Sequence, residues 1–301
     1  MKVDFIKSSY GIYGGGLNEP FRYFGRIISD RLKKENIEFP FDEIEIQLTT
    51  FSQKEKKNED YTNWYKKLPY YYRGKNMVRV ILPITKKENS LDDVFQSINE
   101  AFEIIISKKK KVDNYDSDKI KSILFQLEKE LQTTDLWELN AAYENIFRQE
   151  TIEANRQDRI LREQSNIEKK KLIYDLRFMY HLPNIDLRYF SPYEREFCCE
   201  ILEKLRERKF RLPGYTHLYI MVSDSFENSL FHATRPLNWF VYGIAVLENY
   251  SDYATMKEVE KKRVVFELIK QGLNDIAKID KLDTKILDEV LDEVEQSIVS
   301  R

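Results

Sequence analysis

The sequence predicts an α+β fold, α/β-like in its details, in which two similar βαββα units flank a helical insert. Short apolar segments of strand length alternate with amphipathic segments of helical period toward both ends of the chain. The order strand, helix, strand, long connection, strand, helix occurs over residues 2–111 and again over 171–278. Residues 117–168 between them contain no glycine or proline, which favours helices. The repeated order predicts an internal duplication with a pseudo-twofold axis, and chance recurrence of a common α/β pattern is the alternative.

The first βαββα unit is predicted to span residues 1–112. It begins with a short alternating strand at 3–6 and a loop rich in glycine. Pro20 suits the first turn of the helix that follows, whose apolar residues recur at helical spacing as far as Leu32. The remaining elements predicted for this unit are a half-buried strand, a more buried strand and a helix capped by Ser90, at residues 43–48, 77–84 and 90–105.

The helical insert or connector is predicted at residues 113–170 as a pair of antiparallel helices that turns near Thr133 and Thr134. After Arg148 the apolar positions become sparse, which indicates either an exposed helix or a connector. The second βαββα unit, 171–279, is predicted to contain strands at 172–180, 216–222 and 239–247, with helices near 192–205 and 253–278. An acidic amphipathic helix at 280–301 closes the chain.

The charge balance excludes some classes of partner. The 49 Lys and Arg residues and 51 Asp and Glu residues give a formal net charge of -2, so we expect neither nucleic acid nor an anionic membrane as the main partner. The sequence has no apolar run of membrane-spanning length and no apolar signal segment near residue 1, so the expected location is the cytoplasm. The adjacent Cys198 and Cys199 predict neither a disulfide nor a zinc site, and no metal or cofactor is expected.

The segment 51–76 has the composition of an interaction surface. Seven cationic residues outnumber three acidic ones there, and they are interleaved with aromatic residues. Tyr, Trp and Arg are enriched where protein interfaces gain most of their affinity, and the same residue types can stack on bases. A protein interface, a loop packed on its own sheet and a nucleic-acid surface at 61–75 are therefore alternatives. The candidate partner-binding residues are Tyr61, Trp64, Tyr65, Tyr70, Tyr71, Tyr72, Arg73 and Lys75.

The C-terminal helix is a second candidate surface. Its apolar residues form one stripe, while acidic residues occupy the opposite side. The stripe predicts docking on the chain's own core, and the acidic side can steer a basic partner. The candidate residues are Asp288, Glu289, Asp292 and Glu293.

Two further segments are candidates for a ligand or catalytic site. Gly14, Gly15 and Gly16 lie between a strand and a helix, but the segment lacks the lysine of a phosphate-binding loop and the dinucleotide fingerprint. The connection after the strand at 216–222 contains Asp224, His232 and Arg235, which could form a small acid–base site. No recognised catalytic motif accompanies either segment.

These observations favour a non-enzymatic cytoplasmic protein that binds another protein and neutralises it, in the manner of an immunity or antitoxin-like factor. The alternative is a small enzyme or ligand-binding protein with its site near Gly11 to Gly16 or near Asp224 to Arg235. A nucleic-acid binder that uses residues 61–75 is the third hypothesis.

Overall fold

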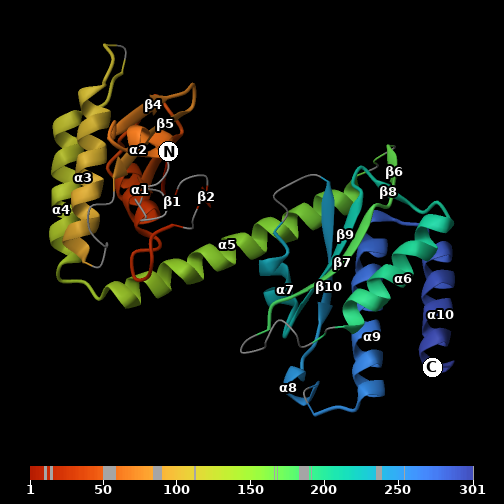
Figure 1. The fold of residues 1–301 in the computed structure, drawn as a ribbon. Coiled ribbons are helices and arrows are strands. Elements are labelled where there is room, and N and C mark those ends of the chain that lie inside the picture. The colour runs from red at the N-terminus through yellow and green to blue at the C-terminus, as the bar shows by residue number, and fades with distance from the viewer. Residues whose placement is uncertain are drawn as a thin grey trace. The chain divides into compact units, whose positions relative to one another are not determined.

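The chain forms two compact units, Met1–Ile146 (unit 1) and Phe147–Arg301 (unit 2), in a computed structural model (Figure 1). The residues described are 1–9, 12–13, 16–49, 59–83, 90–111, 113–165, 167, 169–182, 190, 192–234, 239–253 and 255–300. Helices and several small sheets occur together, so the predicted α+β class is confirmed. None of the helices within the described ranges is both long enough and apolar enough to cross a membrane.

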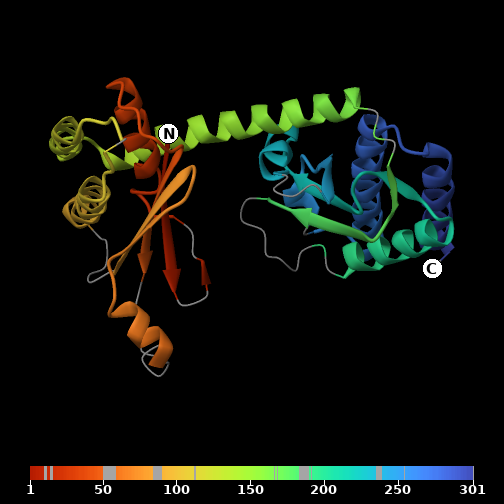
Figure 2. The same ribbon diagram turned by 90° about the horizontal axis from the view of Figure 1, so that it is seen from above.

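Unit 1 is built on a five-stranded sheet with the strand order β2-β1-β3-β5-β4. Its three central strands are parallel, whereas the two edge strands are antiparallel to their neighbours. Helices α1 and α3 pack on one face of this sheet, α4 packs on these two helices, and Figure 2 shows α3 and α4 on the same side. The elements are β1 (Lys2–Ser9), β2 (Ile12–Tyr13), α1 (Phe24–Lys34), β3 (Glu43–Thr49), α2 (Glu59–Tyr65), β4 (Tyr70–Arg73), β5 (Met77–Pro83), α3 (Leu91–Ser107), α4 (Ser117–Leu131) and the start of α5 (Leu136–Gln164).

Helix α1 lies close to β1 because a glycine faces the strand. A Cβ atom on Gly25 would be 2.3 Å from the carbonyl oxygen of Val3. One turn later the Ser29 hydroxyl accepts a hydrogen bond from the Val3 amide at 2.7 Å and donates one to the Gly25 carbonyl at 2.8 Å. The helix therefore packs almost backbone to backbone, and the buried serine satisfies an amide that would otherwise lack a partner.

Unit 2 contains a three-stranded parallel sheet, β10-β9-β7, and a separate antiparallel ribbon of β6 and β8. Helices α6 and α9 pack on one face of the sheet, and α10 packs on these two helices. On the opposite face Ile152 of α5, Leu230 of α7 and Ile244 of β10 form a small separate cluster. The elements are β6 (Lys170–Leu172), β7 (Asp175–Tyr180), α6 (Tyr193–Glu207), β8 (Arg211–Pro213), β9 (His217–Ser223), α7 (Phe226–His232), β10 (Phe240–Val246), α8 (Tyr250–Tyr253), α9 (Glu258–Asp280) and α10 (Thr284–Ser300).

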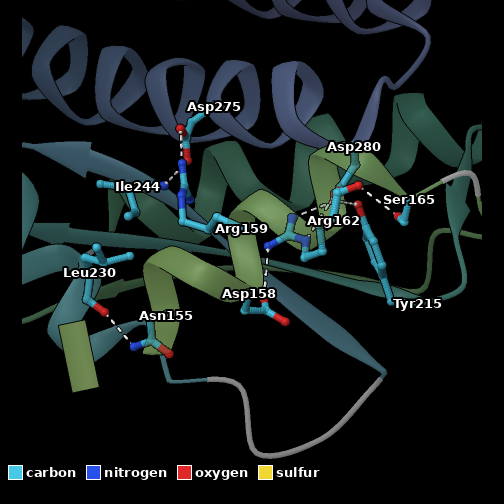
Figure 3. Close-up of polar contacts among 10 residues, drawn as sticks. All are labelled: Asn155, Asp158, Arg159, Arg162, Ser165, Tyr215, Leu230, Ile244, Asp275 and Asp280. Atoms are coloured by element: carbon cyan, nitrogen blue, oxygen red, sulfur yellow. Dashed lines mark hydrogen bonds and ion pairs between the residues drawn. The ribbon is translucent and has the colours of Figure 1, made fainter. Parts of the chain in front are cut away.

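The second half of α5 belongs to unit 2, where it is held by polar contacts (Figure 3). Arg159 donates a hydrogen bond to Asp275 of α9 at 2.6 Å, and the same carboxylate accepts the backbone amide of Ile244 at 2.8 Å. Asn155 donates to the carbonyl oxygen of Leu230 at 2.8 Å. The sparse apolar pattern after residue 148 is thus compatible with a well-anchored helix, because arginines and an asparagine supply the contacts.

A second arginine–aspartate pair lies one turn further along α5. Arg162 donates to both carboxylate oxygens of Asp280, at 3.0 and 2.6 Å, and the Tyr215 hydroxyl donates to the same carboxylate (Figure 3). Both charged side chains are buried, with 9% and 4% of their surface exposed. Burial is the largest single influence on Arg162 and would lower its pKa, but the hydrogen bonds to Asp280 and the negative charge of this carboxylate together raise it.

The two units share one arrangement of strands and helices. In each unit three parallel strands lie side by side in chain order, β1-β3-β5 in unit 1 and β7-β9-β10 in unit 2. One helix follows the first strand, another follows the third strand, and a final helix contacts both of them: α1, α3 and α4 in unit 1, and α6, α9 and α10 in unit 2. Helix α4 lies in the predicted insert and α10 in the predicted C-terminal segment, and each contributes to the core of its unit. The internal duplication stays a prediction.

Candidate functional site

The tyrosine run at residues 70–72 forms part of β4, an edge strand that the sequence analysis placed within a long connection. Because side chains alternate along a strand, Tyr70 and Tyr72 lie on one face of the sheet, and Tyr71 lies on the other. Tyr70 and Tyr72 are each 48% exposed. Tyr71 packs against the core of unit 1, and burial raises the pKa of its hydroxyl. Two of the three tyrosines are therefore presented at the surface.

Tyr70 and Tyr72 lie opposite Ile81 and Arg79 of β5 in the strand register, so these four side chains share a face. This face is opposite to the one on which α1 and α3 pack, since the core residues of β5 are Val78, Val80 and Leu82. Arg79 also forms an ion pair with Glu45 of β3. We call Glu45, Tyr70, Tyr72, Arg79 and Ile81 the tyrosine face of unit 1.

Arg73, a predicted partner-binding residue, is held inside unit 1. Its guanidinium group donates two hydrogen bonds to the carboxylate of Asp113, at 2.6 and 2.8 Å, and lies 5.7 Å from the ring centre of Phe41. The Asp113 side chain is completely buried and also accepts the backbone amide of Lys110 at 2.8 Å. Hydrogen bonding to Arg73 lowers the pKa of Asp113 to about 2, and the same contact raises the pKa of Arg73. This bidentate buried pair gives Arg73 a structural role.

The other residues predicted in the segment 61–75 lie in α2 or near it. Trp64 and Tyr65 are partly exposed at the end of α2, and Lys66, Lys67 and Lys75 are exposed. The backbone of Tyr61 belongs to α2, whereas its side chain is outside the described residues. The exposed lysines supply positive charge on the chain segments that flank β4.

The acidic helix α10 docks on the core of unit 2 through Leu287, Val290, Leu291 and Val294. Asp288, Glu289 and Asp292 are exposed. Glu293 is exposed as well, and it forms ion pairs with Lys204 of α6 and with Arg208, the C-cap of this helix; these contacts lower its pKa. All four predicted acidic residues are thus presented at the surface.

The first alternative site is only partly within the described residues. Gly14 and Gly15 lie outside them, as does Arg235 of the second alternative site. A Cβ atom on Gly16 would make only an ordinary contact, 3.4 Å from the carbonyl oxygen of Phe5, and Gly16 is not among the described glycines with a positive φ. An anion site at these glycines stays a prediction.

The second alternative site contains a histidine pair at the carboxyl ends of two parallel strands. His181 follows β7, and its ring centre lies 3.5 Å from that of His232 at the end of α7. Burial, together with the nearby charges of His181 and Arg148, lowers the pKa of His232 to about 4. Asp224 is held by Asn228 and by the hydroxyls of Ser223 and Ser225. Within the described ranges no three His, Cys, Asp or Glu side chains are grouped so as to hold a metal ion.

Sequence reasoning missed an aromatic cluster on the sheet of unit 2. Its members pack ring to ring, for example His217 against Trp239 with centres 4.5 Å apart and Tyr219 against Phe240 at 5.1 Å. Tyr174 and Trp239 are 66% and 40% exposed, so the cluster reaches the surface. The signal was present as aromatic residues at alternate positions of the strands, but no surface was predicted from them.

No family model, curated protein or solved structure matches this chain. Its function is therefore inferred from its own residues.

Proposed function

We propose that this protein acts without catalysis by binding another protein through the tyrosine face of unit 1. The observation that carries the proposal is the pair Tyr70 and Tyr72, two half-exposed rings on an edge strand. In this proposal the protein works in the cytoplasm as an immunity or antitoxin-like factor, which neutralises its partner by covering the partner's working surface.

The chemistry of the tyrosine face suits a protein partner. A tyrosine ring covers a large area with little loss of conformational freedom, and its hydroxyl can form a hydrogen bond at the interface rim. The two rings are fixed by a strand whose neighbour β5 belongs to the core, so little ordering is needed on binding. Exposed lysines on both sides, Lys66, Lys67 and Lys75, favour a partner with acidic groups around an apolar centre.

The test is recovery of a partner by the immobilised full-length protein from extracts of its native cells, followed by measurement of affinity for the recovered partner. Truncation of an interface tyrosine at a hot spot costs about 2 kcal/mol, or about 30-fold in affinity. We therefore expect Tyr70→Ser with Tyr72→Ser to weaken binding by at least 100-fold. Both rings are half exposed, so the variant should remain folded.

A matched control is Tyr174→Ser, which removes a ring that is 66% exposed on unit 2. This variant should bind the partner with unchanged affinity. Equal affinity of the Tyr70, Tyr72 variant and the unchanged protein would refute the assignment of this face. A salt-sensitive nucleic acid as the recovered partner would instead support the third hypothesis from the sequence.

A further inference from the structure

Unit 2 contains a pocket of about 290 Å³ that is rich in positive charge. Its described lining includes five cationic side chains and only two carboxylates. The cations come from four separate parts of the chain: α5, β6, the segment that leads into β8 together with the first residue of β8, and the turn between α9 and α10. They are Arg162, Lys170, Lys209, Arg211 and Lys281.

Both carboxylates of the pocket already have partners. Asp280 accepts hydrogen bonds from Arg162 and from the Tyr215 hydroxyl (Figure 3). Asp283 accepts the backbone amide of Ile286 at 3.3 Å, in the first turn of α10. Arg162 is thus neutralised by Asp280, while the other cations outnumber the one remaining acidic group.

The ordinary structural explanation accounts for only part of this charge. Lys209 follows Arg208, the C-cap of α6, and Lys281 is the C-cap of α9. Both lysines have positive φ angles, 54° and 50°. Cations stabilise helix C-termini, so these two lysines have a local reason to be there. Lys170 and Arg211 lie on the ribbon of β6 and β8, where no helix end attracts them. Four like charges converge on one cavity although mutual repulsion opposes this arrangement.

We propose that this pocket binds a small phosphate-bearing anion. Ammonium and guanidinium groups are the side chains that recognise phosphate, and the pocket is close in size to the smaller ligand sites of proteins. Helix α10 begins at the pocket, but α6 and α9 end there, so the four cationic side chains and not a helix dipole are what favour an anion. This site is independent of the tyrosine face, which lies in unit 1.

The proposal is tested by isothermal titration calorimetry of the full chain at low salt with two probes, inorganic pyrophosphate and adenosine diphosphate. We expect saturable binding at one site for at least one probe. Preference for pyrophosphate indicates recognition of phosphate alone, and preference for the nucleotide indicates additional contacts to its base or sugar. The variant Lys170→Glu with Lys209→Glu should weaken binding at least tenfold.

A second variant and a control make the result specific. Lys281→Asn removes one charge while keeping a residue that tolerates a left-handed backbone, and it should weaken binding severalfold. Lys108→Glu with Lys121→Glu makes the same change in net charge at exposed positions of unit 1 and should leave the affinity unchanged. Circular dichroism confirms that each variant is folded. The proposal is overturned by absence of saturable binding to the unchanged protein, or by equal weakening in the unit 1 control.

Discussion

Replacement of Arg73 by methionine tests which of two roles this residue has. The sequence predicts that Arg73 binds a partner, whereas the structure pairs it with the buried Asp113. Methionine keeps much of the apolar length of the side chain but removes both hydrogen bonds to Asp113. Asp113 then remains as a carboxylate with no exposed surface and a single described partner, the Lys110 amide at 2.8 Å. Leaving one member of a buried pair without the other costs about 3 to 5 kcal/mol.

The lower end of that range applies to Arg73→Met. The Arg73 side chain is 17% exposed, so water can reach the vacated space, and the Lys110 amide still holds one carboxylate oxygen. We therefore expect a loss of about 3 kcal/mol from the stability of unit 1 at pH 7. Hydrogen exchange measured by mass spectrometry reports the two units separately. Each 1.4 kcal/mol of lost stability speeds exchange through unfolding about tenfold. Peptides from β3 and β5 should therefore exchange about 100-fold faster than in the unchanged protein.

The pH dependence provides a second measurement on the same pair. The pKa of Asp113 falls from 3.8 to about 2 on folding, so its stabilising contribution is present above roughly pH 5 and is lost as the pH falls toward 2. Its size is about 2 kcal/mol. In Arg73→Met this acid dependence should disappear or reverse, because the unpaired buried carboxylate gains stability on protonation.

Lys75→Met is the matched control, because it removes an exposed cation two residues away. It should change the exchange of β3 and β5 less than threefold, as is usual for surface substitutions. Peptides from β9 of unit 2 provide an internal reference in the same samples. Unchanged exchange of β3 and β5 in Arg73→Met, together with loss of partner binding, would show that Arg73 contacts a partner and that the structural reasoning is wrong.

Two further predictions concern unit 2. Gly243→Ala should destabilise unit 2 by about 3 kcal/mol or more, because the added Cβ would lie 2.0 Å from the carbonyl oxygen of Gly272. Hydrogen exchange should then become faster in β9 and stay unchanged in β3. The control is Gly74→Ala, where the nearest contact of the added Cβ is 3.4 Å. Acid should weaken unit 2 as the pH falls from 6.5 to about 4, because the unfolded chain protonates His232 before the folded protein does. His232→Asn should reduce this dependence by about 1 to 2 kcal/mol after allowance for partial exposure, and an unchanged pH profile of β9 exchange would contradict the low pKa.

Local patterns identified the parallel strands and the helices between them. The alternation at 43–48 and the apolar run at 77–84 correspond to β3 and β5, and the helical spacing after Ser90 corresponds to α3. These elements are buried on their own unit's core, so their periodicity reflects their surroundings directly. The prediction of strand 172–180 was approximate, because the chain changes partner after Leu172, from the ribbon to the parallel sheet.

Features that depend on distant partners could not be read from the sequence. Strand β4 follows Pro69 and has only four residues, and its pairing with β5 is what defines it. Arg73 and Asp113 are 40 residues apart, so nothing local distinguishes this arginine from the exposed lysines around it. The cationic pocket of unit 2 likewise gathers residues from four segments of the chain. For such sites composition indicates the residue types, and only the fold indicates which of them meet.

The arrangement shared by the two units indicates where their functions lie. Three parallel strands and three helices recur in Lys2–Leu131 and in Asp175–Ser300, and their side chains serve mainly to form a core. The tyrosines of the proposed protein-binding face lie on β4, which is added at the edge of this common arrangement in unit 1. The proposed anion pocket includes Lys170 and Arg211 of the ribbon, which is an addition of unit 2. Substitutions of the exposed tyrosines of β4 or of the cations of the ribbon should therefore change binding while exchange in β3 and β9 stays constant, whereas Gly243→Ala and Arg73→Met should destabilise their own units through the core and its buried ion pair.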